Sequence, residues 1–418
     1  MKNVIEILRA RGFIEAVTNE SITEALVKPQ KIYIGFDPTA ESLHLGNLVG
    51  IIMLAWFKKC GHTPVGLVGG ATGRIGDPSG RSQERSFLSD DELKRNIAAI
   101  DAQLNKLLGR GVEVLNNDSW LSKMPMTTFL RDVGKHFRLG PMLGKDSVRT
   151  RLESDEGMSY TEFSYQLLQG YDFYHLAEHE GITIQGGGSD QWGNITAGIE
   201  YTRRMSDHQL YGITFPLLTR SDGKKFGKSE GGAIWLDAKH CSPYKFYQYL
   251  IQVADADVCK LLRMLTFVEI EKIEAIEKSL ADGVAVPNAA QRLLADEVTR
   301  FVHGEKGVAI AHKVTEAAKP GAQTVLDLDV LEEIAADMPS ADLSIVDIDG
   351  KTFAEIAVAS GLLKSKGEGN RLVQGGGAYL NNQKVNDANS VFKSSDLIGG
   401  KYLIVGSGKK KKLLVKIK

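Results

Sequence analysis

Alternating strand-like and helix-like segments over residues 31–218 are the feature that most limits how this chain can fold. Apolar strand-like runs occur at 31–36, 63–70, 112–115, 181–186 and 212–218, and helical patterns occur between them at 44–59, 90–109, 127–138, 159–180 and 190–206. Such alternation predicts an α/β domain with a Rossmann-like parallel sheet and helices on both faces. Ligands of these sheets bind outside the carboxyl ends of the strands, so that edge is the predicted site.

The remainder of the chain predicts two further domains, which agrees with its length of 418 residues. We expect the Rossmann-like domain to span 1–230, an all-helical domain 231–335 with Pro243 and Pro287 at breaks between helices, and a linker 336–350. Residues 351–418 predict a small α+β domain, with short helices at 352–363 and 368–374 followed by glycine-rich turns and short strands.

Charge is balanced over the whole chain but not along it. Lys and Arg total 51 and Asp and Glu total 52, so no global basicity indicates a nucleic-acid binder. Residues 398–418, however, contain seven lysines and no acid. These are Lys401, Lys409, Lys410, Lys411, Lys412, Lys416 and Lys418. This segment is either a solubilising tail or a surface for a phosphate backbone.

Cysteine content and the N-terminal segment indicate the compartment. Cys60, Cys241 and Cys259 are too few and too scattered for a disulfide framework or a structural zinc site, and we expect reduced thiols. The first 20 residues read as an amphipathic helix with acids, unlike a signal peptide. No apolar run approaches a membrane span, so we expect a cytoplasmic protein without membrane contact.

Four segments carry residues suited to chemistry. The first runs from Tyr33 through Thr39 to His44, Gly46 and Asn47, where a strand leads into a loop and a helix N-terminus that favours phosphates. Gly46 would let a flat ring lie against the backbone, and the polar side chains could stabilise a phosphoryl group. An ordinary polar helix cap is the alternative.

The second segment, 222–229, places Lys225 and Lys228 around a glycine on a loop, which suits a mobile clamp on a polyphosphate. Its glycine spacing differs from that of a P-loop, and a solvated charged turn is the alternative.

The third segment is a stripe of Tyr165, Gln169 and Asp172 on one face of a helix. Such a stripe indicates a polar ligand or an internal hydrogen-bond network, since buried polar groups need partners. The fourth segment, 186–194, places Gly188, Asp190 and Gln191 between a strand and a helix, where a ribose could approach.

Taken together, these segments resemble the bacterial-type tyrosyl-tRNA synthetases of class I. HLGN (44–47) stands where the class has HIGH, and KFGKS (225–229) stands where it has KMSKS. YxGFDPTAxSLHLGN, ATGRIGDPSGR, YxxLQGYDF and GGSDQWGN follow in the order of the family. The resemblance covers nearly all 418 residues, and the final 70 or so resemble an S4-like RNA-binding domain.

This resemblance implies a two-step reaction that uses ATP as a substrate with Mg²⁺ and no prosthetic group. L-tyrosine forms tyrosyl-adenylate and pyrophosphate, and tyrosine then passes to the 3′ end of tRNA(Tyr). It also implies a homodimer, an anticodon-recognising role for the helical domain and no metal site built by the protein. The implied catalytic residues are Thr39, His44, Asn47, Lys225, Lys228, Arg81 and Arg85. The implied tyrosine-binding residues are Tyr33, Asp37, Asp77, Tyr165, Gln169, Asp172 and Gln191. The implied ATP-binding residues are Gly46, Gly188, Asp190, Lys228 and Ser229.

The chain departs from the family at a few of these positions. Asn47 replaces the second histidine of HIGH, and Arg81 stands where many relatives have lysine. The S4-like helix around 367–371 has fewer basic residues than usual, which shifts the expected RNA contact to Lys384, Lys393 and the lysine-rich segment. The alternatives are a tryptophanyl-tRNA synthetase, a non-catalytic RNA-binding or splicing protein on a synthetase scaffold, and a small-molecule nucleotidyltransferase.

Overall fold

A computed structural model describes most of the chain as two compact units. It describes residues 3–79, 84, 88–109, 111–155, 157–229, 232–318, 328, 331–332, 335, 338–408 and 411–418, and the side chains of all of these except 146–147, 228–229 and 317–318. The first unit combines 1–240 with 253–298, and the second combines 241–252 with 299–418. The division at 230, 335 and 350 stays a prediction.

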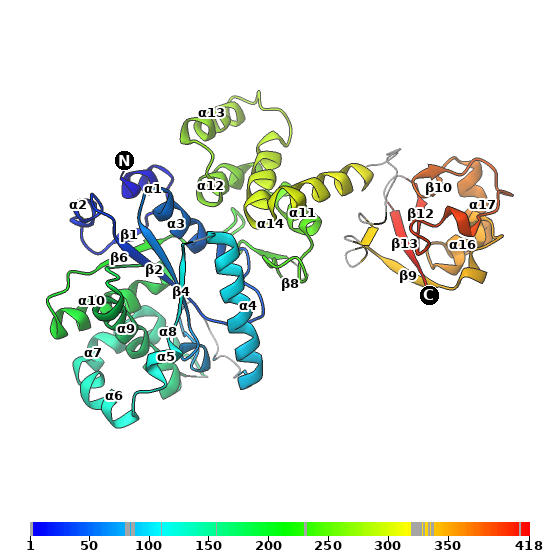
Figure 1. Cartoon of the computed structure of the whole chain (residues 1–418). Coiled ribbons are helices and arrows are strands. Elements are labelled where there is room, and N and C mark those ends of the chain that lie inside the picture. The colour runs from blue at the N-terminus through cyan, green and yellow to red at the C-terminus, as the bar shows by residue number, and fades with distance from the viewer. Residues whose placement is uncertain are drawn as a thin grey trace. The chain divides into compact units, whose positions relative to one another are not determined.

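The first unit is built on a six-stranded sheet in the order β1-β6-β5-β2-β3-β4 (Figure 1). All neighbouring strands are parallel except β1, which is antiparallel to β6. The strands are β1 (Ala16–Val17), β2 (Lys31–Phe36), β3 (Thr63–Val68), β4 (Glu113–Asn116), β5 (Ile184–Gly188) and β6 (Tyr211–Phe215). The predicted α/β class with a parallel sheet is confirmed.

Helices cover both faces of this sheet. Gly50 of α3 (Leu48–Lys59) lies against Ile34, and Leu104 of α4 (Asp90–Leu108) lies against Gly66 on the same face. The opposite face, where the Tyr33 side chain projects, packs against Phe173 of α9 (Tyr160–Glu180) and Ile195 of α10 (Trp192–Met205). The long helices α4 and α9 begin at Ser89 and Ser159, whose side chains accept hydrogen bonds from the third helical N–H.

Shorter elements complete the first unit. They are α1 (Val4–Ala10), α2 (Ile22–Ala25), α5 (Asp118–Leu121), α6 (Met126–Asp132), α7 (Leu139–Leu143), α8 (Asp146–Leu152), the hairpin of β7 (Lys228–Ser229) with β8 (Gly232–Ala233), α12 (Asp255–Leu265) and α13 (Ile270–Ala281). The helix α14 (Ala289–Ala318) continues into the second unit and has a non-helical residue at Gly304. All elements described between 243 and 318 are helices, whereas β8 falls inside the range 231–335 that was predicted to be all-helical, because its two residues pair only with the neighbouring β7.

The second unit contains α11 (Pro243–Ile251) and a five-stranded sheet in the order β11-β10-β12-β13-β9. Its strands are β9 (Ser340–Leu343), β10 (Ala378–Leu380), β11 (Gln383–Lys384), β12 (Tyr402–Ser407) and β13 (Lys411–Ile417). The helices α16 (Phe353–Ala359) and α17 (Lys366–Gln374) pack on it through a core that includes Phe353, Ile356 and Leu403.

Two elements differ from their expected positions. Residues 340–343 fall in the predicted linker but form β9, which pairs in parallel with β13. The sequence did not predict this strand, because its partner lies more than 70 residues later and leaves no local signal. The predicted helix 44–59 begins only at Leu48, because His44 to Asn47 form a bridge and turn before it.

Candidate active site

A cavity of about 750 Å³ opens at the carboxyl ends of the central strands, as the topology predicts. Residues of all four chemistry-bearing segments line it. Those predicted from the sequence are Tyr33, Asp37, Thr39, His44, Gly46, Asn47, Asp77, Tyr165, Gln169, Asp172, Gly188, Asp190, Gln191 and Lys225. Arg81 and Arg85 lie outside the described residues, and of Lys228 and Ser229 only the backbone, in β7, is described.

Tyr33 and Asp172 form the buried floor of the cavity. Tyr33 is 1% exposed, and its hydroxyl has no hydrogen-bond partner among the described residues. Asp172 is 2% exposed and accepts hydrogen bonds from Asn117 Nδ2 at 2.9 Å and Trp120 Nε1 at 2.7 Å. Burial raises the pKa of Asp172 to about 7, although these two hydrogen bonds oppose the shift. The floor therefore offers a phenol and a carboxyl group to one ligand.

Sequence reasoning missed three polar residues at this floor. Gln185 of β5 pairs with Tyr33 across the sheet, is 3% exposed, and its Oε1 has no partner among the described residues. Asn117 and Trp120 fix the carboxylate of Asp172 from the segment after β4. The position of Asn117 at the carboxyl end of a predicted strand was a usable signal, whereas Gln185 looks like an ordinary strand residue.

A chain of amide and carboxylate groups lines the next part of the cavity. Gln191 Nε2 donates to Asp77 Oδ2 at 2.6 Å, and Gln169 Nε2 donates to Gln191 Oε1 at 3.2 Å. On the other side, the Tyr165 hydroxyl donates to Asp37 Oδ2 at 3.1 Å. The structure thus brings the predicted helical stripe together with two acids from loops after other strands. Acids in this arrangement suit an ammonium group.

Burial also affects the ionisation of Asp190, the acid implied to contact the ribose of ATP. It raises the pKa of Asp190, the charge of Asp77 adds to that effect, and Lys225 opposes it. Charges of the second and fourth segments therefore interact across the cavity.

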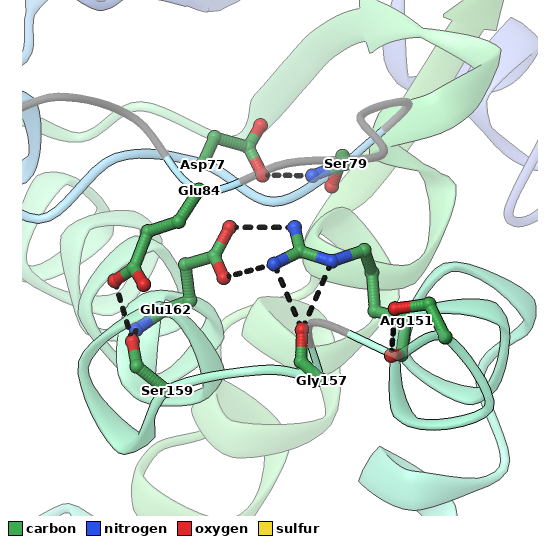
Figure 2. A network of polar contacts seen from close by, with 8 residues as sticks. Asp77, Ser79, Glu84, Arg151, Gly157, Ser159 and Glu162 are labelled. Carbon is green, nitrogen blue, oxygen red and sulfur yellow. Dashed lines mark hydrogen bonds and ion pairs between the residues drawn. The ribbon is translucent and has the colours of Figure 1, made fainter.

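The start of α9 is held by the network in Figure 2. Arg151 and Glu162 form a buried bidentate ion pair at 2.9 and 2.8 Å, and Arg151 also donates to the Gly157 carbonyl oxygen. The Ser159 hydroxyl donates to Glu84, which lines the cavity, at 2.6 Å. This network holds the first turn of the helix that carries Tyr165, Gln169 and Asp172 and joins it to Glu84 at the cavity.

The HLGN segment is held in one conformation by short-range hydrogen bonds. His44 Nδ1 accepts from the Gly46 N–H at 3.0 Å, so a neutral imidazole carries its proton on Nε2 and can donate from there. The His44 N–H donates to Asn47 Oδ1 at 3.0 Å. A Cβ at Gly46 would lie 2.9 Å from the imidazole, which explains the glycine.

The HLGN and KFGKS segments are also joined directly. Leu45 N–H donates to the Ile234 carbonyl at 2.8 Å, and Ile234 N–H donates to the Gly227 carbonyl at 2.9 Å. Gly227 has φ +88°, and a Cβ there would lie 3.2 Å from Leu45 Cβ. Lys225, two residues before Gly227, lines the cavity. The two segments predicted to meet phosphates therefore do lie side by side.

The described residues contain no group of three or more His, Cys, Asp or Glu side chains arranged to hold a metal ion. Within the same ranges, no helix is long and apolar enough to cross a membrane.

Comparison with known families agrees with this fold. Residues 26–319 match the family described as tRNA synthetases class I (W and Y), so the chain belongs to that class of enzymes. Residues 330–415 match the tyrosine–tRNA ligase SYY-like C-terminal domain. Full-length similarity to curated tyrosine–tRNA ligases then places the chain in the tyrosine–tRNA ligase family.

Individual relatives support this assignment. The chain is 51% identical to the tyrosine–tRNA ligase of Protochlamydia amoebophila over 100% of this chain and 99% of that protein. It is 50% identical to the chloroplastic/mitochondrial enzyme of Arabidopsis thaliana over 99% of this chain and 84% of that protein. A C-terminally truncated mitochondrial tyrosyl-tRNA synthetase of Coccidioides posadasii superimposes with a TM-score of 0.65 and 34% identity, covering 75% of this chain and 92% of that one. None of the alternative functions gains support from these similarities.

Proposed function

We propose that this chain activates L-tyrosine with ATP and transfers it to tRNA(Tyr). The observation that carries this proposal is the buried Tyr33 hydroxyl beside Asp172 at the floor of the cavity. A phenolic hydroxyl can pair with both groups, whereas a phenylalanine ring would leave the Tyr33 hydroxyl buried without a partner. An indole does not need both groups, so the floor favours tyrosine over tryptophan.

The first step requires positioning and charge stabilisation from the protein. A carboxylate oxygen of tyrosine attacks the α-phosphorus of ATP, and the bond to the leaving pyrophosphate breaks. We assign the substrate ammonium group to Asp77, Tyr165 and Gln169, with Asp37 supporting Tyr165 and Gln191 near the carboxylate. The ribose would meet Gly188 and Asp190, and the adenine would lie against Gly46.

Charge that develops on the departing phosphates would be stabilised by donors at the other end of the cavity. We assign this role to Thr39, His44 and Lys225, which line it, with Asn47 donating to a ribose oxygen. Lys228, Ser229, Arg81 and Arg85 keep their implied roles on the strength of the motif alone.

Mg²⁺ would enter bound to the ATP phosphates, because this ion keeps several waters and is commonly held by substrate phosphates with one or two carboxylates. The acids of the cavity already have partners: Asp37 and Asp77 accept hydrogen bonds, and the charge of Lys225 acts on Asp190. This fits a cavity that receives the metal together with its nucleotide.

The homodimer is supported by large apolar side chains that are exposed on the helices α6 to α9, which follow one another along the chain. Met126 is 74% exposed, Leu139 64% and Tyr160 70%, and Leu130, Leu143 and Leu152 are exposed as well. Large exposed apolar side chains, where they adjoin on a surface, mark sites of association. Light scattering of the native chain and of a Leu139→Asp variant tests this part of the proposal, because only a true interface residue would shift the dimer toward monomer.

We assign adenylate formation to 1–230, anticodon recognition to the helical segment 231–335 and further RNA contact to 351–418. The similarity of 330–415 to a tyrosine–tRNA ligase C-terminal domain supports the last assignment. We also propose a cytoplasmic location, which the free thiols of Cys60, Cys241 and Cys259 support. Fractionation of the source cells tests it.

The decisive experiment is ATP–pyrophosphate exchange with each amino acid in turn, followed by charging of tRNA(Tyr). We expect exchange that depends on tyrosine and charging of tRNA(Tyr) alone. Exchange driven by tryptophan would favour the tryptophanyl alternative. Binding of RNA without exchange by any amino acid would favour a non-catalytic protein.

A further inference from the structure

The lysine hairpin 218–226 stands at the rim of the cavity with most of its residues exposed. Its base is closed by the Phe226 N–H donating to the Leu218 carbonyl, and its tip by Arg220 N–H donating to the Lys224 carbonyl at 2.8 Å. These bonds hold the hairpin together, but they do not fix where its tip lies relative to the cavity.

One buried carboxylate outside the hairpin binds that tip. Asp257, in the first turn of α12, is 7% exposed. Its Oδ1 and Oδ2 accept the Ser221 N–H at 2.9 and 3.1 Å, and Oδ2 also accepts the Ser221 hydroxyl at 3.1 Å. Hydrogen bonds to a charged group are stronger than those between neutral groups. The contact therefore fixes the outer end of the hairpin.

The helix that carries Asp257 is itself fixed at its other end. The Arg11 guanidinium is 3% exposed and donates to the carbonyls of Leu262, Arg263, Thr266 and Val268 at 2.6 to 3.1 Å. In return, Arg263 Nη1 donates to the Ala10 carbonyl at 3.1 Å. A cation at this position satisfies the last carbonyls of the helix and complements its dipole. Helix α12 thus forms a rigid support between the N-terminal helix and the hairpin.

With the tip bound in this way, Lys225 lines the cavity and its charge acts on Asp190. We infer that Asp257 is a positioning residue that holds the lysine hairpin over the nucleotide phosphates by binding Ser221. This inference rests on the proposed function, because the hairpin acts in catalysis only if the chain activates an amino acid with ATP.

The test compares Asp257→Ala with Asp255→Asn in the full chain. Asp255 lies in the same turn of α12, but its carboxylate accepts from Gln291 rather than from the hairpin. Asp257→Asn and Ser221→Ala are milder variants. The asparagine retains one acceptor oxygen without the charge, and Ser221→Ala keeps the backbone N–H. Thermal unfolding of all four variants shows whether each is folded.

The first measurement is limited trypsin digestion without ligands, which does not depend on activity. Arg220, Lys224 and Lys225 are cleavage sites in the hairpin. We expect Asp257→Ala to speed cleavage at these bonds, Asp257→Asn and Ser221→Ala to do so less, and Asp255→Asn to match the native chain. Equal cleavage of the native chain and Asp257→Ala would show that Asp257 does not hold the hairpin in place.

The second measurement is tyrosine-dependent pyrophosphate exchange. Because misplaced catalytic groups cost roughly 10-fold to 100-fold in rate, we expect Asp257→Ala to lower kcat by about that factor with an unchanged KM for tyrosine. Faster cleavage with native kcat, or loss of tyrosine binding together with a lower unfolding temperature than Asp255→Asn, would overturn the positioning role. Absence of exchange in the native chain would instead refute the proposed function, and the digestion would still show whether Asp257 holds the hairpin through Ser221.

Discussion

Trp120 and Asp172 form the closest polar contact at the floor of the cavity, with the indole Nε1 donating to Asp172 Oδ1 at 2.7 Å. Together with Asn117, the indole holds a carboxyl group whose pKa burial raises from 3.8 to about 7. Because the folded chain then binds this proton more tightly than the unfolded chain, the two states differ in bound protons between about pH 4 and pH 7.

This difference predicts a pH dependence of stability. As pH rises through that window, the native state must ionise Asp172 in a buried site, so its contribution to stability falls, by at most about 4 kcal/mol for a shift of this size. The asparagine of the Asp172→Asn variant does not titrate, so that variant does not lose stability in this way. We therefore expect its free energy of unfolding to rise relative to that of the native chain between about pH 4 and pH 7, as measured by urea denaturation. Parallel pH profiles for the two chains would contradict the raised pKa.

Tyr33→Phe is expected to weaken the discrimination against phenylalanine. The Tyr33 hydroxyl is buried without a partner among the described residues, so its loss should not lower the unfolding temperature in the absence of ligand. One lost hydrogen bond to the substrate should cost about 0.5–1.5 kcal/mol. The readout is the ratio of kcat/KM for tyrosine and phenylalanine in pyrophosphate exchange. Tyr211→Phe removes a buried hydroxyl outside the cavity, serves as the control and should leave the ratio unchanged.

His44→Ala is expected to lower kcat while KM for tyrosine and ATP changes little. The imidazole lines the cavity and can donate from Nε2, and we assign this bond to the phosphate charge that develops in the transition state. The measurement is steady-state pyrophosphate exchange with both substrates varied. His240→Ala is a suitable control, because both histidines contact Trp235 but His240 does not line the cavity. A variant that loses tyrosine binding but retains normal single-turnover chemistry would contradict this role.

Gln103 is expected to stabilise the fold through the loop that precedes His44. Its Oε1 accepts the Leu43 N–H and its Nε2 donates to the Ser42 hydroxyl, both at 2.9 Å in the interior. Gln103→Leu would leave a buried N–H unpaired, which costs about 1–3 kcal/mol. Urea denaturation measures this loss. Asn105→Ala, whose exposed side chain bonds within α4, should lose much less, and equal losses would refute the prediction.

Local sequence signals predicted the parts of the fold that depend on neighbouring residues. The helical pattern at 90–109 located α4, and the spacing of Tyr165, Gln169 and Asp172 put three polar groups on one face of α9. These signals need no knowledge of the rest of the chain, which is why they were readable.

The missing parts depend on contacts between distant segments. Gln185 becomes part of the cavity only because β5 pairs with β2 in a register that puts it beside Tyr33. Asp257 binds Ser221 across 36 residues, and nothing in either local sequence indicates that contact. The pairing of β9 with β13 is hidden for the same reason.

Three lysines of the second unit are expected to contact tRNA, and replacing them should leave adenylate formation unchanged. Lys384 and Lys393 are exposed and Lys416 is half-buried, and they belong to a unit that does not include the cavity. Each lysine that neutralises a phosphate releases counterions, so replacing one should reduce the slope of log affinity against log salt by roughly 1. We expect the variant in which Lys384, Lys393 and Lys416 are all replaced by Gln to bind tRNA(Tyr) more weakly, with a flatter salt dependence and less charging, while pyrophosphate exchange stays native.

The control replaces Lys28, Lys94 and Lys123 of the first unit by Gln, which changes the net charge equally. Native charging and an unchanged salt slope in the C-terminal variant would refute RNA contact by these residues, and loss of exchange would show that the two activities are not separate.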